Sequence, residues 1–299
     1  VPWGRPEPDF VFRRWPVPWP SALIRPDALH WSAGELVIGT PYQLYRAVPG
    51  SNSSWPLRRI AGLQPKDDFA VGEVPLCEEA GSCLKATLSE GFLRLSLAGA
   101  GSESAMIRIS GTPWRNLAGI QVPCDSLQTM LSAAQPEPVQ GRCLLIAGWD
   151  GVRLPVAVIR RPMHGEQWPE VVHPFFDVPF KILAERPGAL QARTKPAEES
   201  CAADSSKEVL SLTLEPDAAQ ASLRLWALRE GGELFAWELL SGRTLGRWNL
   251  PGFGREFEAA AICAGQASGQ GRAQLILAGR SRRGGQPIPE LLISKIPNL

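Results

Sequence analysis

Residues 225–245, LWALREGGELFAWELLSGRTL, decide the fold. Two runs rich in Leu, Ala and Trp flank the pair Gly231-Gly232, and Ser241-Gly242 follows the second run. Short apolar runs bounded by glycine and serine are typical of strands joined by tight turns. The stretch therefore predicts neighbouring antiparallel strands, and residues 245–250 supply a further strand directly after it.

The same unit recurs along the chain. In each copy an apolar strand is followed by a second and a third strand, and the second strand ends in Ala-Gly in three copies. The five copies occupy residues 27–48, 83–109, 126–160, 209–239 and 257–296. Apolar runs at residues 55–62, 114–119 and 245–250 supply a fourth strand after the first, second and fourth copies. Four antiparallel strands that repeat in this way form the blades of a propeller.

Residues 225–245 resemble part of a blade in WD40-like β-propellers, where a strand turns, runs to a Trp near its end and enters a turn before the outer strand. The resemblance covers most of the chain and implies an all-β fold. Gly-His and Trp-Asp dipeptides do not recur, so the particular propeller family stays open. A pair of β-sandwiches or another all-β fold is the first alternative, and a mixed α/β fold is the second.

The two ends of the chain predict how the propeller closes. The fifth copy stops after its third strand, whereas residues 10–16 form a strand with no earlier blade to join. We therefore predict one propeller domain over residues 1–299, closed by a strand from the Pro-rich segment 1–20. Five blades are expected, with six as the alternative. Residues 162–208 read as an irregular insertion or a degenerate blade, in which 175–183 form an outer strand.

The bulk composition limits the classes of function. Hydrophobic residues make up 44% of the chain and charged residues 20%, enough apolar material for a sizeable core. The formal net charge of +1 gives no global attraction to nucleic acid or an anionic membrane. No apolar stretch reaches the roughly 18 residues that span a bilayer, so we expect a soluble protein. The compartment stays open, with an organelle lumen or the extracellular space among the candidates.

The six cysteines include one candidate pair. Cys77 and Cys83 flank the turn-prone stretch Glu-Glu-Ala-Gly-Ser, so a disulfide between them would close a small loop, and two thiols are the alternative. Asn52-Ser53-Ser54 matches the glycosylation acceptor pattern. Both features are compatible with an oxidising compartment.

The sequence contains no recognisable motif for catalysis, metal binding or cofactor binding. We therefore predict neither an enzyme nor a metal or cofactor site. The histidines His30, His164 and His173 have no metal-ligand spacing, and no Gly-x-Ser-x-Gly elbow or phosphate-binding loop occurs. Some five-bladed propellers cleave glycosidic bonds with paired carboxylates, so the aspartates in loops are candidates for such a pair. The candidates are Asp27, Asp125, Asp150 and Asp177.

The loops between second and third strands are the candidate partner-binding surface, because in propellers they gather on one face with the blade-to-blade connections. Here they carry Trp149, Asp150, Arg153, Arg229, Arg280, Arg282 and Arg283. Trp and Arg dominate the energetics of protein interfaces. An ordinary solvated loop face, with Trp149 covering the end of a blade, is the alternative.

These observations favour a non-enzymatic scaffold that binds other protein subunits within a larger assembly. A glycan-binding propeller lectin is the alternative that the repeats and the 11 tryptophans suggest. A carbohydrate-active propeller enzyme is a further alternative, which the loop carboxylates suggest.

Overall fold

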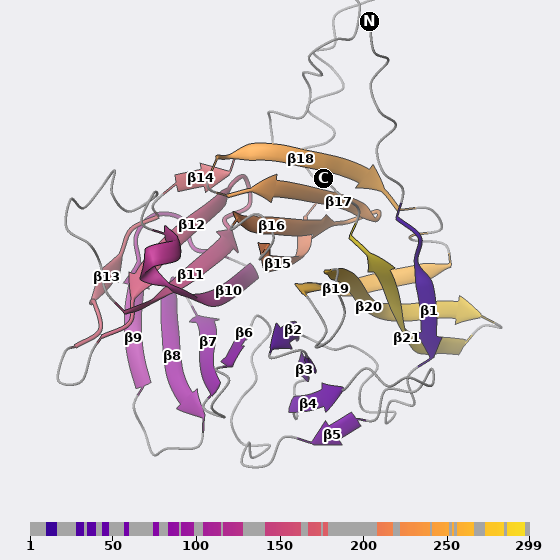
Figure 1. The fold of residues 1–299 in the computed structure, drawn as a ribbon, viewed down its shortest axis with the longest axis horizontal. Helices are drawn as coiled ribbons and strands as arrows, with labels where there is room; N and C mark the ends of the chain where they lie inside the picture. The colour runs from indigo at the N-terminus through magenta and orange to yellow at the C-terminus, as the bar shows by residue number, and fades with distance from the viewer. Residues whose placement is uncertain are drawn as a thin grey trace, which may run out of the picture.

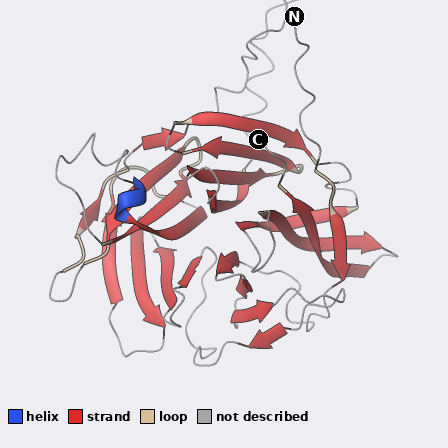
Figure 2. Cartoon of the chain, in the orientation of Figure 1, coloured by secondary structure: helices blue, strands red, loops and turns tan. Residues whose placement is uncertain are grey.

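The computed structural model describes somewhat more than half of the chain. The described residues are 10–16, 28–32, 35–39, 44–47, 57–59, 74–77, 83–89, 91–98, 104–114, 116–127, 141–162, 167–174, 176–178, 208–217, 222–239, 241–250, 253, 256–265, 273–283 and 286–296. These residues are strands joined by turns, and the only helix among them is the short 3-10 helix Cys124–Leu127 (Figure 2).

The described strands form five sheets, which we number as blades in chain order. Blade one contains β2 (Ala28–Ser32), β3 (Glu35–Gly39), β4 (Leu44–Ala47) and β5 (Leu57–Arg59). Blade two contains β6 (Val74–Cys77), β7 (Cys83–Ser89), β8 (Phe92–Ala98), β9 (Ser104–Ile109) and β13 (Val171–Val172). Blade three contains β10 (Asn116–Pro123), β11 (Arg142–Trp149), β12 (Leu154–Arg160) and β14 (Phe176–Val178). Blade four contains β15 (Val209–Asp217), β16 (Ser222–Arg229), β17 (Glu233–Glu238) and β18 (Arg243–Asn249). Blade five contains β19 (Phe257–Gly265), β20 (Gln274–Arg283), β21 (Gln286–Lys295) and β1 (Arg13–Pro16).

The five sheets form a closed ring. The first strands of the blades, β2, β6, β10, β15 and β19, contact one another in cyclic order and lie nearest the centre in Figure 1. Side-chain hydrogen bonds show that β15 and β19 run in the same direction. The amide of Ile262 donates to Ser211 Oγ (3.1 Å), and the amide of Ala264 donates to Thr213 Oγ1 (3.4 Å). Antiparallel sheets arranged radially in this way make a β-propeller, as the sequence predicts.

The hydrophobic core lies between neighbouring blades, so the inner strands are apolar on both faces. In β11, Leu144 and Ile146 pack towards blade two, whereas Leu145 and Ala147 pack towards blade four. A strand that is covered on both sides reads as a continuous apolar run and not as an alternating one. This arrangement explains the unbroken runs that mark the repeats in the sequence.

The predicted closing strand is confirmed. Strand β1 pairs antiparallel with β21, with Arg13 opposite Ile293, and so completes blade five from the other end of the chain (Figure 1). Just before β1, the ring of Phe10 lies edge-on to Trp248 at a centroid distance of 5.1 Å. The Arg14 guanidinium lies 3.1 Å from the carboxylate of Glu256. The N-terminal segment therefore joins the interface between blades four and five.

The strand assignment of blades two and three is shifted by one strand relative to the prediction. Residues 114–119, expected to end blade two, belong largely to β10, the innermost strand of blade three. Residues 126–132 were expected to start blade three, but Ser126 and Leu127 lie in the 3-10 helix and the rest lie outside the described residues. Blade two begins earlier than expected, at β6. This strand has only four residues and contains Pro75, and a proline within a short run argues against a strand.

The predicted irregular region links two blades. Phe176–Val178, within the predicted outer strand 175–183, pair with β12 and complete blade three. Before that, β13 crosses to blade two and pairs parallel with β9, where Val171 lies opposite Arg108. The described residues of the region therefore belong to existing blades, and residues 179–207 lie outside the description.

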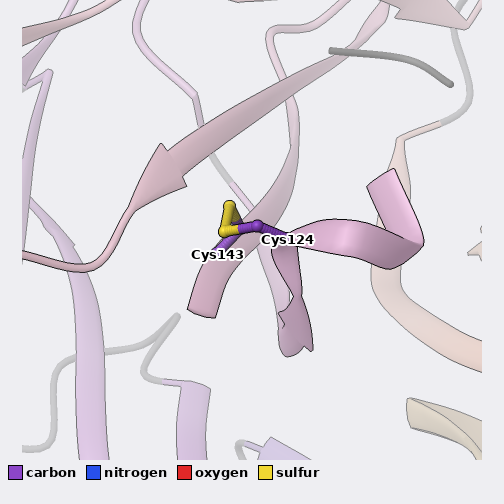
Figure 3. The surroundings of a disulfide bond; sticks show 2 residues. All are labelled: Cys124 and Cys143. Atoms are coloured by element: carbon purple, nitrogen blue, oxygen red, sulfur yellow. A yellow bond between two sulfur atoms is a disulfide. The ribbon is translucent and has the colours of Figure 1, made fainter. Parts of the chain in front are cut away.

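A disulfide joins Cys124 at the start of the 3-10 helix to Cys143 in β11 (Figure 3). This bond was not predicted from the sequence, although both cysteines flank the same insertion between neighbouring strands. By the chain-entropy model, a bond across 19 residues contributes about 3 kcal/mol to stability. The predicted pair Cys77 and Cys83 lie directly opposite each other across β6 and β7. Their side chains lie outside the description, so that disulfide stays a prediction.

The Ala-Gly ends of the second strands mark close approaches. A Cβ atom on Gly148 would lie 2.3 Å from the Trp114 ring. On Gly279 it would lie 2.1 Å from the carbonyl oxygen of Glu258. Only glycine fits at such contacts, which gives a physical reason for its recurrence in the repeats.

Candidate interaction surface

The second-to-third-strand turns lie at one end of the propeller. The first three strands of each blade pair antiparallel, so the first strands start at the same end as these turns. We call this end the turn face. Its described parts are the turn 150–153 of blade three, the turn 230–232 of blade four and the paired ends of β20 and β21 in blade five.

The turn of blade three is held by its own aspartate. Asp150 Oδ1 accepts hydrogen bonds from the amides of Val152 (2.8 Å) and Arg153 (2.6 Å). Gly151 adopts a φ of +101°, a conformation that side chains disfavour. Asp150 is therefore occupied in shaping the turn. Trp149 was expected to be exposed but is only 5% exposed, since it packs in the core between blades three and four.

The turn of blade four contains a buried ionic cluster. Arg229 was expected on the partner-binding surface, yet it is only 6% exposed. Its guanidinium lies 3.4 Å from Glu233, which also accepts a 3.0 Å hydrogen bond from Arg247. Both guanidinium carbons lie over the Phe235 ring, at 5.5 and 5.4 Å from its centroid. Arg229 therefore serves the structure of the turn and adds almost no exposed surface.

Blade five places Arg280 in a similar role. Its guanidinium contacts the Glu258 carboxylate at 2.7 and 2.8 Å. The next arginines, Arg282 and Arg283, lie at the end of β20, and their side chains are outside the description. Among the predicted surface residues whose side chains are described, Arg153 is the one classed as exposed. The structure therefore assigns most of the others to turn and blade stability.

Large apolar side chains are exposed at the turn face instead. Val152 at the tip of the blade-three turn is 70% exposed. Leu210, near the start of β15, is 37% exposed, and Ile288, near the start of β21, is 41% exposed. None of the three was predicted at the surface, and Leu210 lies in a strand run that reads as core. The three side chains come from three consecutive blades.

Among the candidate catalytic carboxylates, Asp150 is the one whose side chain the structure describes, and it shapes its own turn. No group of three or more His, Cys, Asp or Glu side chains with metal-binding geometry occurs among the described residues. His173 shares a 2.8 Å hydrogen bond with Ser110 Oγ. The side chains of His30, His164, Asp27, Asp125 and Asp177 lie outside the description. No described helix is long and apolar enough to cross a membrane.

Comparison with known proteins adds little beyond the fold. No protein-family model matches the sequence, and no curated protein matches it. The β-propeller domain of Myceliophteria thermophila Cps50 (Swd1) is similar over 89% of this chain and 67% of its own, with 13% identity and a TM-score of 0.38. KlHsv2 with loop 6CD replaced by a Gly-Ser linker is similar over 89% of this chain and 69% of its own, with 9% identity and a TM-score of 0.32. The propeller assignment therefore rests on the ring of five sheets described above.

Proposed function

We propose that this propeller is a non-enzymatic scaffold that binds another protein through its turn face, as a subunit of a larger assembly. The observation that carries the proposal is the exposure of Val152, Leu210 and Ile288 on three consecutive blades. Exposed apolar side chains gathered on one face are typical of protein interaction sites.

The turn face also has the rigidity that a binding surface needs. Val152 stands on a turn that Asp150 fixes with two backbone hydrogen bonds. The neighbouring turn rests on the buried cluster around Glu233. A surface that is already ordered loses little conformational entropy on binding, so apolar burial contributes more of its free energy to affinity.

The experiment is to measure the native size of the protein, with mass spectrometry of the proteins that co-elute. We expect elution well above 32.5 kDa with fixed companions. The double substitution Val152→Glu, Ile288→Glu places two charges in the apolar surface and should lower companion binding at least about tenfold. Both side chains are exposed, so the blades should remain folded.

Val11→Glu is the matched control. Val11 is 74% exposed but lies beside the closing strand, away from the turn face. It should leave companion binding unchanged. Elution as a lone monomer, or equal binding by the double variant and the wild type, would refute the proposed face.

A further inference from the structure

The outer strands of blade two carry a second exposed patch, separate from the apolar side chains of the turn face. Phe92 and Arg94 lie in β8, Met106 and Arg108 in β9, and Val171 in β13. Strand register places Phe92 opposite Arg108 and Arg94 opposite Met106, and β13 places Val171 opposite Arg108 on the other side. These five residues therefore form two adjacent rows on one face of the sheet, which we call the blade-two patch.

The apolar members of the patch are well exposed. Met106 is 65% exposed, Val171 43% and Phe92 39%. The alternate residues of the same strands, including Leu93 and Ile107, point the other way and are buried against blade three. The patch is therefore a sheet face that is firmly anchored from behind and open in front.

The two arginines of the patch have no counter-charge among the residues that the structure describes. Arg94 and Arg108 are both exposed, and among the described residues neither forms an ion pair. Glu170, whose carbonyl oxygen accepts a hydrogen bond from the Arg108 amide, makes no ion pair with either of them. Arg14, Arg229 and Arg280, by contrast, each lie against a glutamate of the chain.

We infer that the blade-two patch binds an extended acidic peptide segment of a partner protein. Arg94 and Arg108 are diagonal neighbours on adjacent strands, about 7–8 Å apart at the backbone. Carboxylates two residues apart on an extended chain point the same way and lie about 7 Å apart. A segment of the pattern Asp-x-Asp therefore matches the arginine spacing, and flanking apolar side chains match Phe92, Met106 and Val171. The adaptable side chain of Met106 suits such a contact.

The composition of the patch favours a peptide over a nucleic acid. Nucleic-acid sites neutralise a row of phosphates with many Lys and Arg side chains. This patch has two arginines among three aliphatic or aromatic side chains, on a chain of formal net charge +1. Two carboxylates with apolar neighbours satisfy both its charge and its exposed apolar surface.

The test uses the full chain and a fluorescent peptide, acetyl-Leu-Thr-Asp-Thr-Asp-Thr-Leu, in which Leu and Asp alternate with Thr. Fluorescence anisotropy should show saturable binding that weakens with added salt. The matched peptide with both Asp replaced by Asn should bind the wild type about tenfold more weakly. The acidic peptide should also bind the double variant Arg94→Gln, Arg108→Gln about tenfold more weakly than it binds the wild type. The charge-reversed protein Arg94→Glu, Arg108→Glu should lose the acidic peptide and bind the version with Lys in place of Asp.

The outcomes separate this proposal from the one for the turn face. Val152→Glu, Ile288→Glu should bind the acidic peptide as the wild type does. Equal affinity for the Asp and Asn peptides, or no gain of Lys-peptide binding by the charge-reversed protein, would overturn the assignment. Tighter binding of a single-stranded oligonucleotide than of the acidic peptide would also overturn it, in favour of a nucleic-acid site.

Discussion

Glu233 lies between two arginines at the turn of blade four and forms an ion pair with each of them. Its carboxylate is 3.4 Å from Arg229 and 3.0 Å from Arg247, and its residue is only 5% exposed. A buried charge is tolerated when partners compensate for its lost hydration, and here the arginines also stack on Phe235. The glutamate is therefore the centre of the cluster. Its negative charge lies between the two guanidinium groups that stack on the same Phe235 ring.

Glu233→Ala should lower the free energy of unfolding by about 3 kcal/mol, because it leaves Arg229 buried without this carboxylate. Urea denaturation measures the change. Glu256→Ala is the control, since the Glu256 side chain is 71% exposed beside Arg14 and its loss should cost below about 1 kcal/mol. Equal losses in the two variants would contradict the role given to the cluster.

Strand β1 is the element on which closure of the ring depends. It covers the outer edge of β21 from Glu290 to Ile293, and these residues would otherwise present an unpaired strand edge. Exposed edges promote pairing between molecules. Phe10 adds an apolar anchor at Trp248, so the strand contributes both hydrogen bonds and packing.

Deletion of residues 1–16 should therefore lower the thermal midpoint by about 5 °C or more and cause association through β21. Calorimetry and light scattering measure the two effects. A synthetic peptide of residues 8–18 should restore the monomer. Deletion of residues 1–9 is the control, because it keeps Phe10 and β1, and it should behave as the full chain. A stable monomer after the longer deletion would show that β1 does not close the ring.

The whole molecule is a ring whose two ends meet within one blade. Because neighbouring blades share each core cluster, the stability of one blade depends on the next. The apolar turn face and the blade-two patch lie on different blades of the ring.

A circular permutant tests the ring directly. Residue 296 is joined to residue 10 by a short Gly-Ser linker, and the new ends are placed between residues 190 and 191, between blades three and four. We expect stability within about 1 kcal/mol of the wild type in urea, because every described sheet stays intact. The matched permutant opened between Gly231 and Gly232 cuts blade four and should be clearly less stable. Equal stability of the two permutants would argue against blades as the folding units.

The sequence was sufficient for the propeller, the repeat and the closing strand. Blade four was predicted strand by strand because Gly231-Gly232 and Ser241-Gly242 mark its turns. Blades two and three were shifted because β6 is short and contains Pro75, while 114–119 reads as an outer strand. Strands such as β11 are covered on both faces, so the apolar pattern reports the period of the repeat but not its phase.

The candidate surface was less predictable than the fold. Trp149 and Arg229 were expected at the surface because each adjoins a turn, but neighbouring side chains bury both of them. The sequence alone determined the repeat, most of its strands and that the chain forms a closed all-β ring. The tertiary structure decided which side chains face solvent and that Arg94 lies diagonal to Arg108. The reason is physical: strand formation follows local side-chain pattern and turn residues, whereas burial and pairing depend on the approach of segments far apart in the chain.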